Sequence, residues 1–589
     1  MIELPLLADR LLASALRPEY TILIGILLMI VVPNLGNAKI RIPMTRIRIP
    51  VLLGGRRFKA TSDPSIPSTI ALMTLLLAMM NALFTFAGEP PMGSAVACIT
   101  AAGLVDVGCD DVTDYVLRVD PFSRMMEVIF YASLIFVSGA MVHRMPATPG
   151  AEGPSPRAEE GVRQRMIERL LNNRRQVDFH LLILFVAFGM SIVALATNLF
   201  LLFVGLELAS LAIYVLVAFH KESAESGEAG VKYFITGSVS SAVGLYGLSL
   251  LFVWNGNVSL VGAAGLPAAW AAMSSPDPLA LAGIGLMLVG FGFKVSAVPF
   301  HFAAPDAYAG TTAPVAGMLA TASKAMGFAA LLRVLLVVAA PSGNDAHWLG
   351  LLGLISVITM TWGNLAALSS DNPKRMLAYS SVAHAGYMLA AITAAGSGSV
   401  DAATQQLLVT AVIFHLAVMV FFKLGAFLVI SMLEMEGRGS HVSDFNGLAS
   451  RDPIIAIAMF VFMLSLAGVP PFSGFLSKLL MLDGIIQASA ASGAVGATGL
   501  MAWAQSADWI LWLAIAIGLN SALSLFYYLR IGLVMFSEES DRTRPMSRAP
   551  FLRIAIVVSL VATLAFGIGS LSDRLLAMVA FAANQLLAF

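Results

Sequence analysis

The chain has 589 residues, of which 58% are hydrophobic and only 12% are charged, and its mean hydropathy is +0.85. Soluble domains carry about 25% charged residues, so this composition excludes an ordinary soluble enzyme. Thirty-five basic residues balance thirty-five acidic ones, which gives no sign of nucleic-acid binding. Two cysteines are too few for a disulfide scaffold, a zinc cluster or an iron–sulfur site. The composition indicates a protein embedded in a bilayer.

About fourteen apolar stretches are long enough to cross a membrane as helices, which takes about 20 residues each. Their saturation with Leu, Ala, Val, Phe and Gly favours helices over the alternating strands of a β-barrel. The sequence therefore predicts an all-α polytopic membrane protein. In chain order the expected helices lie near 18–35, 68–87, 124–143, 178–196, 198–219, 229–255, 278–302, 311–339, 347–369, 373–395, 404–433, 453–488, 509–537 and 551–576.

Basic residues concentrate in alternate loops, above all between Lys39 and Lys59 and between Arg157 and Arg175. Because Lys and Arg mark cytoplasmic loops, we expect both termini on the non-cytoplasmic side of a bacterial cell membrane. The residues before the first stretch lack a basic n-region, which indicates an anchor and not a cleaved signal peptide. The outer loop near 88–123 holds Cys98 and Cys109, for which a disulfide is permitted but not established by spacing.

Ionisable residues inside the apolar stretches are the strongest functional signal, since a central Lys or Asp costs about 2.5–3.5 kcal/mol on insertion. Glu207 lies mid-helix in LLFVGLELASLAIY, too deep for so short a side chain to reach water. Lys294 lies five residues before Pro299, which is expected to break the helix, and Lys324 is central in MLATASKAMGFAAL. Burial and like charge both make a lysine release its proton more readily, which favours proton exchange.

The second half of the chain repeats this pattern. Lys423 follows His415 by eight residues, which places both on one helix face. Lys478 follows the Pro470–Pro471 break in LAGVPPFSGFLSK. A charged helix followed by a proline-broken helix with a lysine thus occurs twice, and such duplication is typical of transporters.

Weaker candidates are three histidines and one lysine. His301, His384 and His415 are possible proton relays, although a buried histidine is as often simply hydrogen-bonded. Lys232 lies near the start of its helix, where a side chain reaching toward water is the plain alternative. Arg333 and Arg530, nearer to helix ends, are expected to be interfacial anchors.

No glycine-rich phosphate motif, paired metal ligands or haem-attachment sequence is present. The chain is therefore expected to bind no cofactor and to hold no catalytic redox centre.

Five motifs resemble the antiporter-like subunits of respiratory complex I, the NADH–quinone oxidoreductase. They are, in order, GLELASLAIYVLVAF, GFKVSAVPFHFAAPDAYAG, TASKAMGFAALLR, KRMLAYSSVAHAGYML and LSLAGVPPFSGFLSK. The likeness covers roughly 178–537. The segments GLELASL and KYFITGS most resemble the subunit N branch, the counterpart of mitochondrial subunit 2.

The resemblance implies a fourteen-helix fold with two inverted five-helix repeats, each containing a broken helix. On this basis the chain divides into an N-terminal three-helix region with an Arg-rich cytoplasmic loop (1–177), two antiporter-like repeats (178–346 and 347–537) and a C-terminal helix (538–589). The partners implied are neighbouring antiporter-like and small membrane subunits and the lipid bilayer, while NADH and quinone would be used by other subunits.

Matching motif positions carry the family's proton path onto this sequence. Glu207 resembles the glutamate of the fifth helix, and Lys294 and Lys478 resemble the lysines of the two broken helices. Lys324 resembles the central connecting lysine, and Lys423 the eleventh-helix lysine of the sister subunits. Lys232 resembles the KYF lysine of subunit N.

Two positions depart from the family pattern. Ala303 stands where tryptophan is usual and Ala309 where glutamate is usual. Both belong to an expected cytoplasmic loop after the first broken helix, so loop packing or access to the path is expected to differ there. The region before residue 178 matches poorly, and no family contact is carried onto it.

The hypothesis from these observations is proton translocation coupled to electron transfer from NADH to quinone in partner subunits. A change in the Glu207–Lys294 pairing would push a proton toward Lys324 and then toward Lys423 and Lys478. Two alternatives remain: a multisubunit sodium/proton antiporter, and a hydrogenase-type or quinone-reducing complex with another electron donor. A purely structural scaffold does not explain so many central lysines.

Overall fold

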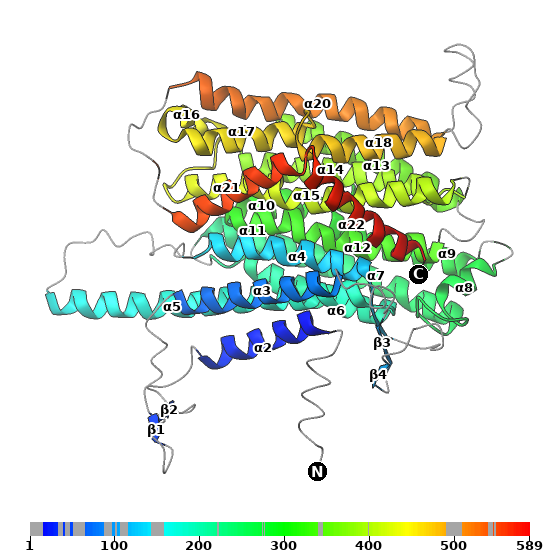
Figure 1. Ribbon diagram of the computed structural model, residues 1–589, viewed down its shortest axis with the longest axis horizontal. Coiled ribbons are helices and arrows are strands. Elements are labelled where there is room, and N and C mark those ends of the chain that lie inside the picture. Colours follow the sequence, from blue (N-terminus) through cyan, green and yellow to red (C-terminus); the bar gives the residue numbers. More distant parts are fainter. Residues whose placement is uncertain are drawn as a thin grey trace.

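The computed structural model describes residues 16–32, 39–41, 48–50, 65–86, 97–100, 103–105, 116–142, 158–220, 223–273, 275, 277–339, 346–398, 400–489, 509–539, 546 and 549–588. The prediction of an all-α architecture is confirmed, because most of these residues are helical. Figure 1 labels most of the helices and strands.

Up to Ala339, the described residues form five short strands and eleven α-helices. The strands are β1 (Lys39–Arg41), β2 (Arg48–Pro50), β3 (Ala97–Thr100), β4 (Gly103–Val105) and β5 (Leu117–Val119). The helices are α2 (Arg17–Val31), α3 (Ser65–Phe86), α4 (Pro121–Ala140), α5 (Ala158–Leu195), α6 (Leu199–Val217), α7 (Ala224–Asn255), α8 (Leu266–Ala271), α9 (Pro278–Val295), α10 (Ala303–Gly310), α11 (Ala313–Met318) and α12 (Lys324–Leu332), with π-helical turns η5 (Leu319–Ser323) and η6 (Arg333–Ala339).

The second half is helical throughout its described residues. Its elements are α13 (Ala346–Leu368), α14 (Pro373–Ala395), α15 (Ala402–Glu434), the 3₁₀ turn η7 (Val442–Phe445), α16 (Leu448–Arg451), α17 (Pro453–Ala467), α18 (Ser473–Ser489), α20 (Trp509–Ser537), α21 (Pro550–Ala565) and α22 (Ser570–Leu587).

Each of the fourteen predicted stretches coincides with one or more helices, but the count of fourteen spans is not confirmed. Within the described residues, ten helices are long and apolar enough to cross a membrane, or eleven if the bent pair α21–α22 is one span. The remaining stretches correspond to α2, with 15 described helical residues, to α14, and to the broken pair α17–α18. Breaks and polar residues within a span therefore explain the lower count.

The last helix differs from the single straight one expected at 551–576. It divides into α21 and α22, which are bent by 84° relative to each other. Gly569 precedes α22 with φ +105°, a backbone conformation that favours glycine. The sequence GIGS between the two helices thus allows a bend that the apolar pattern alone conceals.

Antiparallel strands form the few described non-helical segments before α4. β1 pairs with β2, and β3 pairs with both β4 and β5. Cys98 lies in β3, whereas Cys109 lies outside the described residues, so the possible disulfide is left without a structural description.

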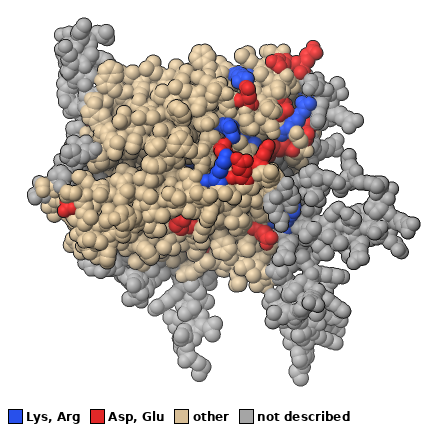
Figure 2. All heavy atoms as spheres, turned by 180° about the vertical axis from the view of Figure 1, so that it is seen from behind, with Lys and Arg blue, Asp and Glu red and all other residues tan. Residues whose placement is uncertain are grey.

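The long helices run side by side, with α2 along one edge of the bundle and α20 along the opposite edge (Figure 1). Charged side chains visible in Figure 2 gather mostly toward one end of these helices, and uncharged residues form most of the rest of that face. This distribution is the one expected when an apolar belt faces lipid and the loops face water.

Two spans lie deep inside the bundle. The most apolar 18-residue segment of Ala313–Val338 is entirely buried, and 94% of the corresponding segment of Ala402–Glu434 is buried. In α20, at the edge of the bundle, the buried share is 33%. These inner spans carry Lys324 and Lys423, so both lysines are shielded from lipid and from bulk water by other helices.

Two spans are interrupted in the same way. α9 ends at Val295, where Ser296 adopts a left-handed conformation with φ +61° before Pro299. α17 ends at Ala467, where Gly468 has φ +84° before Pro470. A left-handed residue ends a helix and exposes its last carbonyl groups. Both predicted broken helices are therefore present.

Close packing of α13 against α14 predicts a specific stability effect. A Cβ on Gly363 would lie 2.6 Å from the backbone nitrogen of Ala383, whereas a Cβ on Gly350 of the same helix would meet nothing within 4 Å. Gly363→Ala is expected to destabilise the protein by about 1–3 kcal/mol, because two backbones must move apart. Gly350→Ala is the matched control and is expected to leave stability unchanged. Thermal unfolding of the detergent-solubilised protein measures both; equal melting temperatures for the two variants would contradict this packing.

Candidate functional site

Glu207 lies at the middle of α6 and is partly buried. The hydroxyl of Ser241 on α7 donates a hydrogen bond to its Oε1. On α7, Thr236 donates to the carbonyl of Lys232 at 2.8 Å and Ser240 donates to that of Thr236 at 2.9 Å. Hydroxyl groups therefore extend along α7 from the level of Lys232 to that of Glu207.

Lys294 is the last but one residue of α9 and is only 3% exposed. Its Nζ has no hydrogen-bond partner among the described residues and lies 5.1 Å from the ring centroid of Tyr214. Glu207 is close enough for a Coulomb interaction, but no salt bridge joins the two in this part of the chain. The expected Glu207–Lys294 pair is thus not a direct contact here.

Lys324 connects the first broken helix to the interior of the bundle. Its Nζ donates at 2.7 Å to the carbonyl of Val295, the last residue of α9. Lys324 immediately follows the π-helical turn η5, and such turns are frequent at functional sites. Within η5, the Thr321 hydroxyl lies 2.6 Å from that of Ser133 on α4, which ties this turn to the N-terminal helices.

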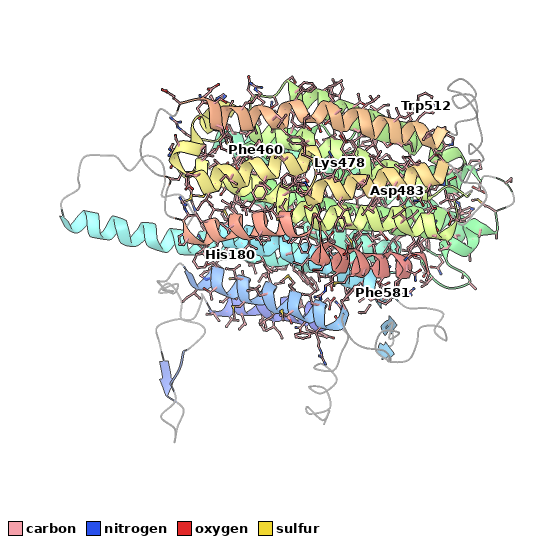
Figure 3. All side chains as sticks on the ribbon, turned by 45° about the horizontal axis from the view of Figure 1, so that its top comes forward. His180, Phe460, Lys478, Asp483, Trp512 and Phe581 are labelled. Carbon is pink, nitrogen blue, oxygen red and sulfur yellow. The ribbon has the colours of Figure 1, made fainter. Side chains whose placement is uncertain are left out.

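Lys478 has the corresponding position in the second half. Its Nζ donates to the carbonyls of Leu466 at 2.9 Å and Ala467 at 3.1 Å, the last turn of α17. A cation is favoured at a helix C-terminus, where carbonyl groups lack partners. Figure 3 shows Lys478 near the middle of the bundle's length. In both halves a lysine ammonium group therefore binds the end of an interrupted helix.

A chain of buried hydrogen bonds leads from Lys423 toward Lys478. Lys423 Nζ donates to Ser380 Oγ at 2.9 Å, and Ser380 is hydrogen-bonded to the hydroxyl of Tyr528. That hydroxyl lies 3.3 Å from Nε2 of His384. Lys423 lies on α15, Ser380 and His384 lie on α14, and Tyr528 lies on α20. Three helices therefore build the first part of this hydrogen-bond series.

Two histidines complete the chain. Nδ1 of His384 lies 2.9 Å from Nε2 of His415, and the two rings are stacked. Nδ1 of His415 lies 2.8 Å from Oγ of Ser477, the residue before Lys478. Both imidazoles are at most 1% exposed. Each hydroxyl and each neutral imidazole in this series both donates and accepts, which is what stepwise proton transfer requires.

Two sequence candidates lie apart from this chain. His301 is 4% exposed and packs against Phe302, and its Nδ1 has no hydrogen-bond partner among the described residues. Lys232 is half exposed and forms salt bridges with Glu228 at 2.6 Å and Asp306 at 3.0 Å. Its contacts are therefore at the end of the bundle and not in the buried row.

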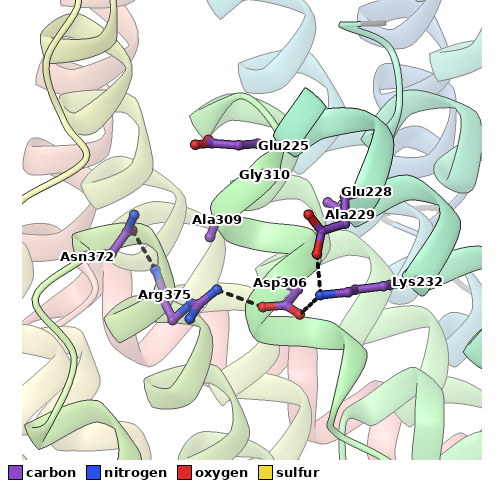
Figure 4. Close-up of a pocket in the computed structure, with 9 residues that line it drawn as sticks. All are labelled: Glu225, Glu228, Ala229, Lys232, Asp306, Ala309, Gly310, Asn372 and Arg375. Carbon is purple, nitrogen blue, oxygen red and sulfur yellow. Dashed lines mark hydrogen bonds and ion pairs between the residues drawn. The ribbon is translucent and has the colours of Figure 1, made fainter. Parts of the chain in front are cut away.

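Asp306 also binds Arg375 at 2.7 Å, so it bridges α7 and α14 at the mouth of a pocket of about 260 Å³ (Figure 4). Ala309 lines this pocket at the position where the family pattern has glutamate. The departure noted in the sequence thus leaves open space at one end of the bundle.

Arg333 is not an interfacial anchor. It is fully buried, and its Nη2 donates to the carbonyl of Ala194 at 2.5 Å and lies 3.8 Å from Asp120. Arg530, by contrast, is half exposed and pairs with Asp371 at 2.7 Å. The prediction of an interfacial position for Arg333 rested on its closeness to a helix end, and it is wrong because other helices cover that end.

Sequence reasoning missed Ser380, Ser477 and Tyr528. Ser380 precedes His384 by four residues, which places both on one face of α14, and Ser477 adjoins Lys478. This spacing was a usable signal for the two serines. Tyr528 has no such signal, because it reaches His384 from a helix 144 residues away.

Comparison with known proteins places this architecture in a family. The family model described as "NADH:quinone oxidoreductase/Mrp antiporter, TM" matches residues 196–501, just over half of the chain. The chain therefore belongs to this family of membrane-embedded subunits.

Among its relatives are proteins named subunit N. The chain is 37% identical over 446 residues to NADH-quinone oxidoreductase subunit N 2 of Sorangium cellulosum, which covers 74% of this chain and 78% of the relative. It is also 37% identical to F(420)H(2) dehydrogenase subunit N of Methanosarcina mazei, over 67% of this chain and 76% of that one. A chain of respiratory complex I from Thermus thermophilus with bound aureothin has 26% identity and a TM-score of 0.65, covering 95% of this chain and 98% of its own. The resemblance seen in the motifs is thereby confirmed.

Proposed function

We propose that the chain is a proton-translocating membrane subunit of an NADH–quinone oxidoreductase, in which it conducts protons along its buried Glu/Lys row. Electron transfer from NADH to quinone takes place in partner subunits, and this chain holds no redox centre and binds no cofactor. Its partners are neighbouring antiporter-like and small membrane subunits of the complex. The relatives named subunit N support the assignment to such a complex.

The observation that carries the proposal is the buried series from Lys423 through Ser380, Tyr528, His384 and His415 to Ser477. Lysines that only filled space between helices would not need hydrogen-bonding groups between them. A series of groups that each donate and accept gives a proton a route from Lys423 to Ser477, the residue before Lys478. Structural packing alone does not require this order.

The energy scale is compatible with pumping. Moving one charge across about 100 mV requires about 2.3 kcal/mol. Burial and neighbouring charges change the proton affinity of a lysine by up to about 4–7 kcal/mol. In the mechanism we infer, redox-driven changes near Glu207 release a proton from Lys294 to Lys324, and from there it passes toward Lys423 and Lys478.

Proton entry is assigned to the pocket beside Asp306 and Lys232 (Figure 4). Charged side chains line this pocket, and we assign its side of the membrane to the cytoplasm because Lys- and Arg-rich loops mark that side. From there the hydroxyls of α7 lead to Glu207. Both termini then lie on the opposite side of a bacterial cell membrane.

The two repeats are assigned to 178–346 and 347–537, between an N-terminal region (1–177) and a C-terminal region (538–589). Their shared plan is supported by the two interrupted helices, each ending in carbonyl groups bound by a lysine. In this division Lys294 and Lys324 belong to the first repeat, and Lys423 and Lys478 to the second.

A second candidate is a subunit of a complex with another electron donor, because one relative is named a subunit of F(420)H(2) dehydrogenase. The family description also includes Mrp antiporters, which favours a sodium/proton antiporter as a further candidate. Isolating the protein from its native membrane in mild detergent and assaying NADH-dependent quinone reduction separates these candidates. Activity in the same particle supports the proposal. An intact large complex that does not oxidise NADH would contradict it and would direct attention to the other two.

A further inference from the structure

Three charged side chains are buried together in the N-terminal helices, outside the lysine row. Glu19 lies on α2, and Arg124 and Glu127 lie on α4. They are 6%, 1% and 0% exposed, respectively. None has a place in the proton path proposed above, and two carboxylates for one guanidinium is an unusual combination in a membrane interior.

Both carboxylates bind the same nitrogen of Arg124. Nη1 donates at 2.9 Å to Oε1 of Glu19, and it also donates to Oε2 of Glu127. A terminal guanidinium nitrogen carries two hydrogens, so each carboxylate takes one. The two carboxyl groups are thereby held side by side on one guanidinium nitrogen. Two unprotonated carboxylates at that separation would repel each other strongly in a site without water.

Two hydroxyl groups lie beside Glu127. Ser191 on α5 donates to the carbonyl of Ala187 at 3.0 Å, and its Oγ lies 2.6 Å from the Tyr131 hydroxyl. The Tyr131 hydroxyl donates at 3.4 Å to Oε1 of Glu127. Both oxygens of Glu127 therefore have a donor, because its Oε2 accepts from Arg124.

Glu19 supplies an independent observation. Its Oε2 is buried and has no hydrogen-bond partner among the described residues. A buried carboxylate oxygen without a donor is costly, whereas a carboxyl group that shares a proton with its neighbour is not.

The neighbouring elements bring other ionisable groups, most of which have partners of their own. Arg118 pairs with Asp120, which also faces Arg333. Further ionisable residues lie in the described parts of α2 and of the helices that pack against α2 and α4. They are Arg17, Arg175, Asp178, His180, Lys324, His415, Lys423, Glu434, Arg553, Asp573 and Arg574. In the described residues, the Glu19 and Glu127 carboxylates bind no cation other than Arg124.

We propose that Glu19 and Glu127 form a proton-binding site in which the two carboxyl groups share one proton beside Arg124. The bound proton cancels the excess negative charge of the two carboxylates over the one guanidinium. The site lies near the ends of the spans, because Glu19 is in the first turn of α2 and Glu127 is seven residues into α4. It contains no residue of the lysine row.

Infrared difference spectroscopy of the purified complex, in water and in deuterium oxide, tests this site. Wild-type complex is expected to show a carbonyl-stretch band of a protonated carboxylic acid that shifts in deuterium oxide. Glu127→Gln and Glu19→Gln are each expected to abolish the band, because each leaves one carboxylate paired with Arg124. Asp483→Asn, an exposed carboxylate on α18, is the control and is expected to leave the band intact.

Tyr131→Phe keeps both carboxyl groups and is expected to shift the band without removing it, which provides a test if a glutamine variant fails to assemble. Survival of the band in either assembled glutamine variant would overturn the shared proton. An unshifted band in Tyr131→Phe would show that the protonated acid is not next to Tyr131, and it would likewise overturn the proposed site.

Discussion

Complexes that contain Lys423→Met are expected to assemble but to translocate protons at least about tenfold more slowly, which corresponds to about 1.4 kcal/mol or more in barrier height. Lys423 begins the buried series and is fully enclosed, so no water can replace its ammonium group. Methionine has a similar length and no proton to give. Proton uptake by proteoliposomes during quinone reduction measures the effect.

Lys423→Arg separates proton carriage from positive charge. Arginine keeps the charge and can still donate to Ser380, but it does not release its proton in proteins. We therefore expect this variant to be as slow as Lys423→Met, provided that both assemble to the same extent. Rapid proton translocation in Lys423→Arg would show that the position needs only a cation and would contradict its assigned role.

Tyr528→Phe is expected to have the second large effect. The Tyr528 hydroxyl is the group that joins Ser380 to His384, and phenylalanine fills the same space without it. The change leaves buried hydrogen-bonding groups unsatisfied, at a cost of about 1–3 kcal/mol. Proton translocation is expected to fall severalfold or more while the helices stay packed.

The adjacent residue provides a matched control. Tyr527 is also buried on α20 and its ring packs against that of Tyr528, but its hydroxyl donates at 2.9 Å to Oδ1 of Asn364 and not to a residue of the series. Tyr527→Phe is expected to alter stability to a similar extent and to leave proton translocation near wild type. Equal loss in both variants would mean that packing, and not the buried series, determines the rate.

The apolar pattern predicted the helices well because membrane spans need long uninterrupted apolar runs. Proline predicted both helix breaks, since it removes a backbone donor and clashes with the preceding turn. The same pattern concealed the bend between α21 and α22, because the residues around Gly567 and Gly569 are as apolar as the helices they separate. The count of fourteen spans is not confirmed, since among the described residues α14 and the α17–α18 pair do not meet the length and apolarity expected of a span on their own.

The lysines and histidines could be found from the sequence because each is costly in an apolar helix. Their partners could not be found in this way. Asp306 links Lys232 to Arg375 across three segments of the chain, and hydroxyl groups such as that of Tyr528 carry little insertion cost. Such contacts depend on which helices pack together, and local spacing does not encode that.

A further reason why buried charges cannot be predicted from the sequence appears at Glu19, Arg124 and Glu127. Each lies within a few residues of a helix start, where a charged side chain normally reaches water. Only the packing of α2 against α3 and α5, and of α4 against both, encloses these charges. Arg333 was predicted to be interfacial for the same reason, because it lies near a helix end.

The central claim, that the buried row carries protons, is tested most directly at Lys294. Its ammonium group is buried, lacks a hydrogen-bond partner among the described residues and lies next to the interrupted end of α9. Proton translocation should be measured in proteoliposomes with fully assembled complex containing Lys294→Met. The account predicts that translocation falls to a small fraction of wild type. Wild-type translocation by the assembled variant would contradict it.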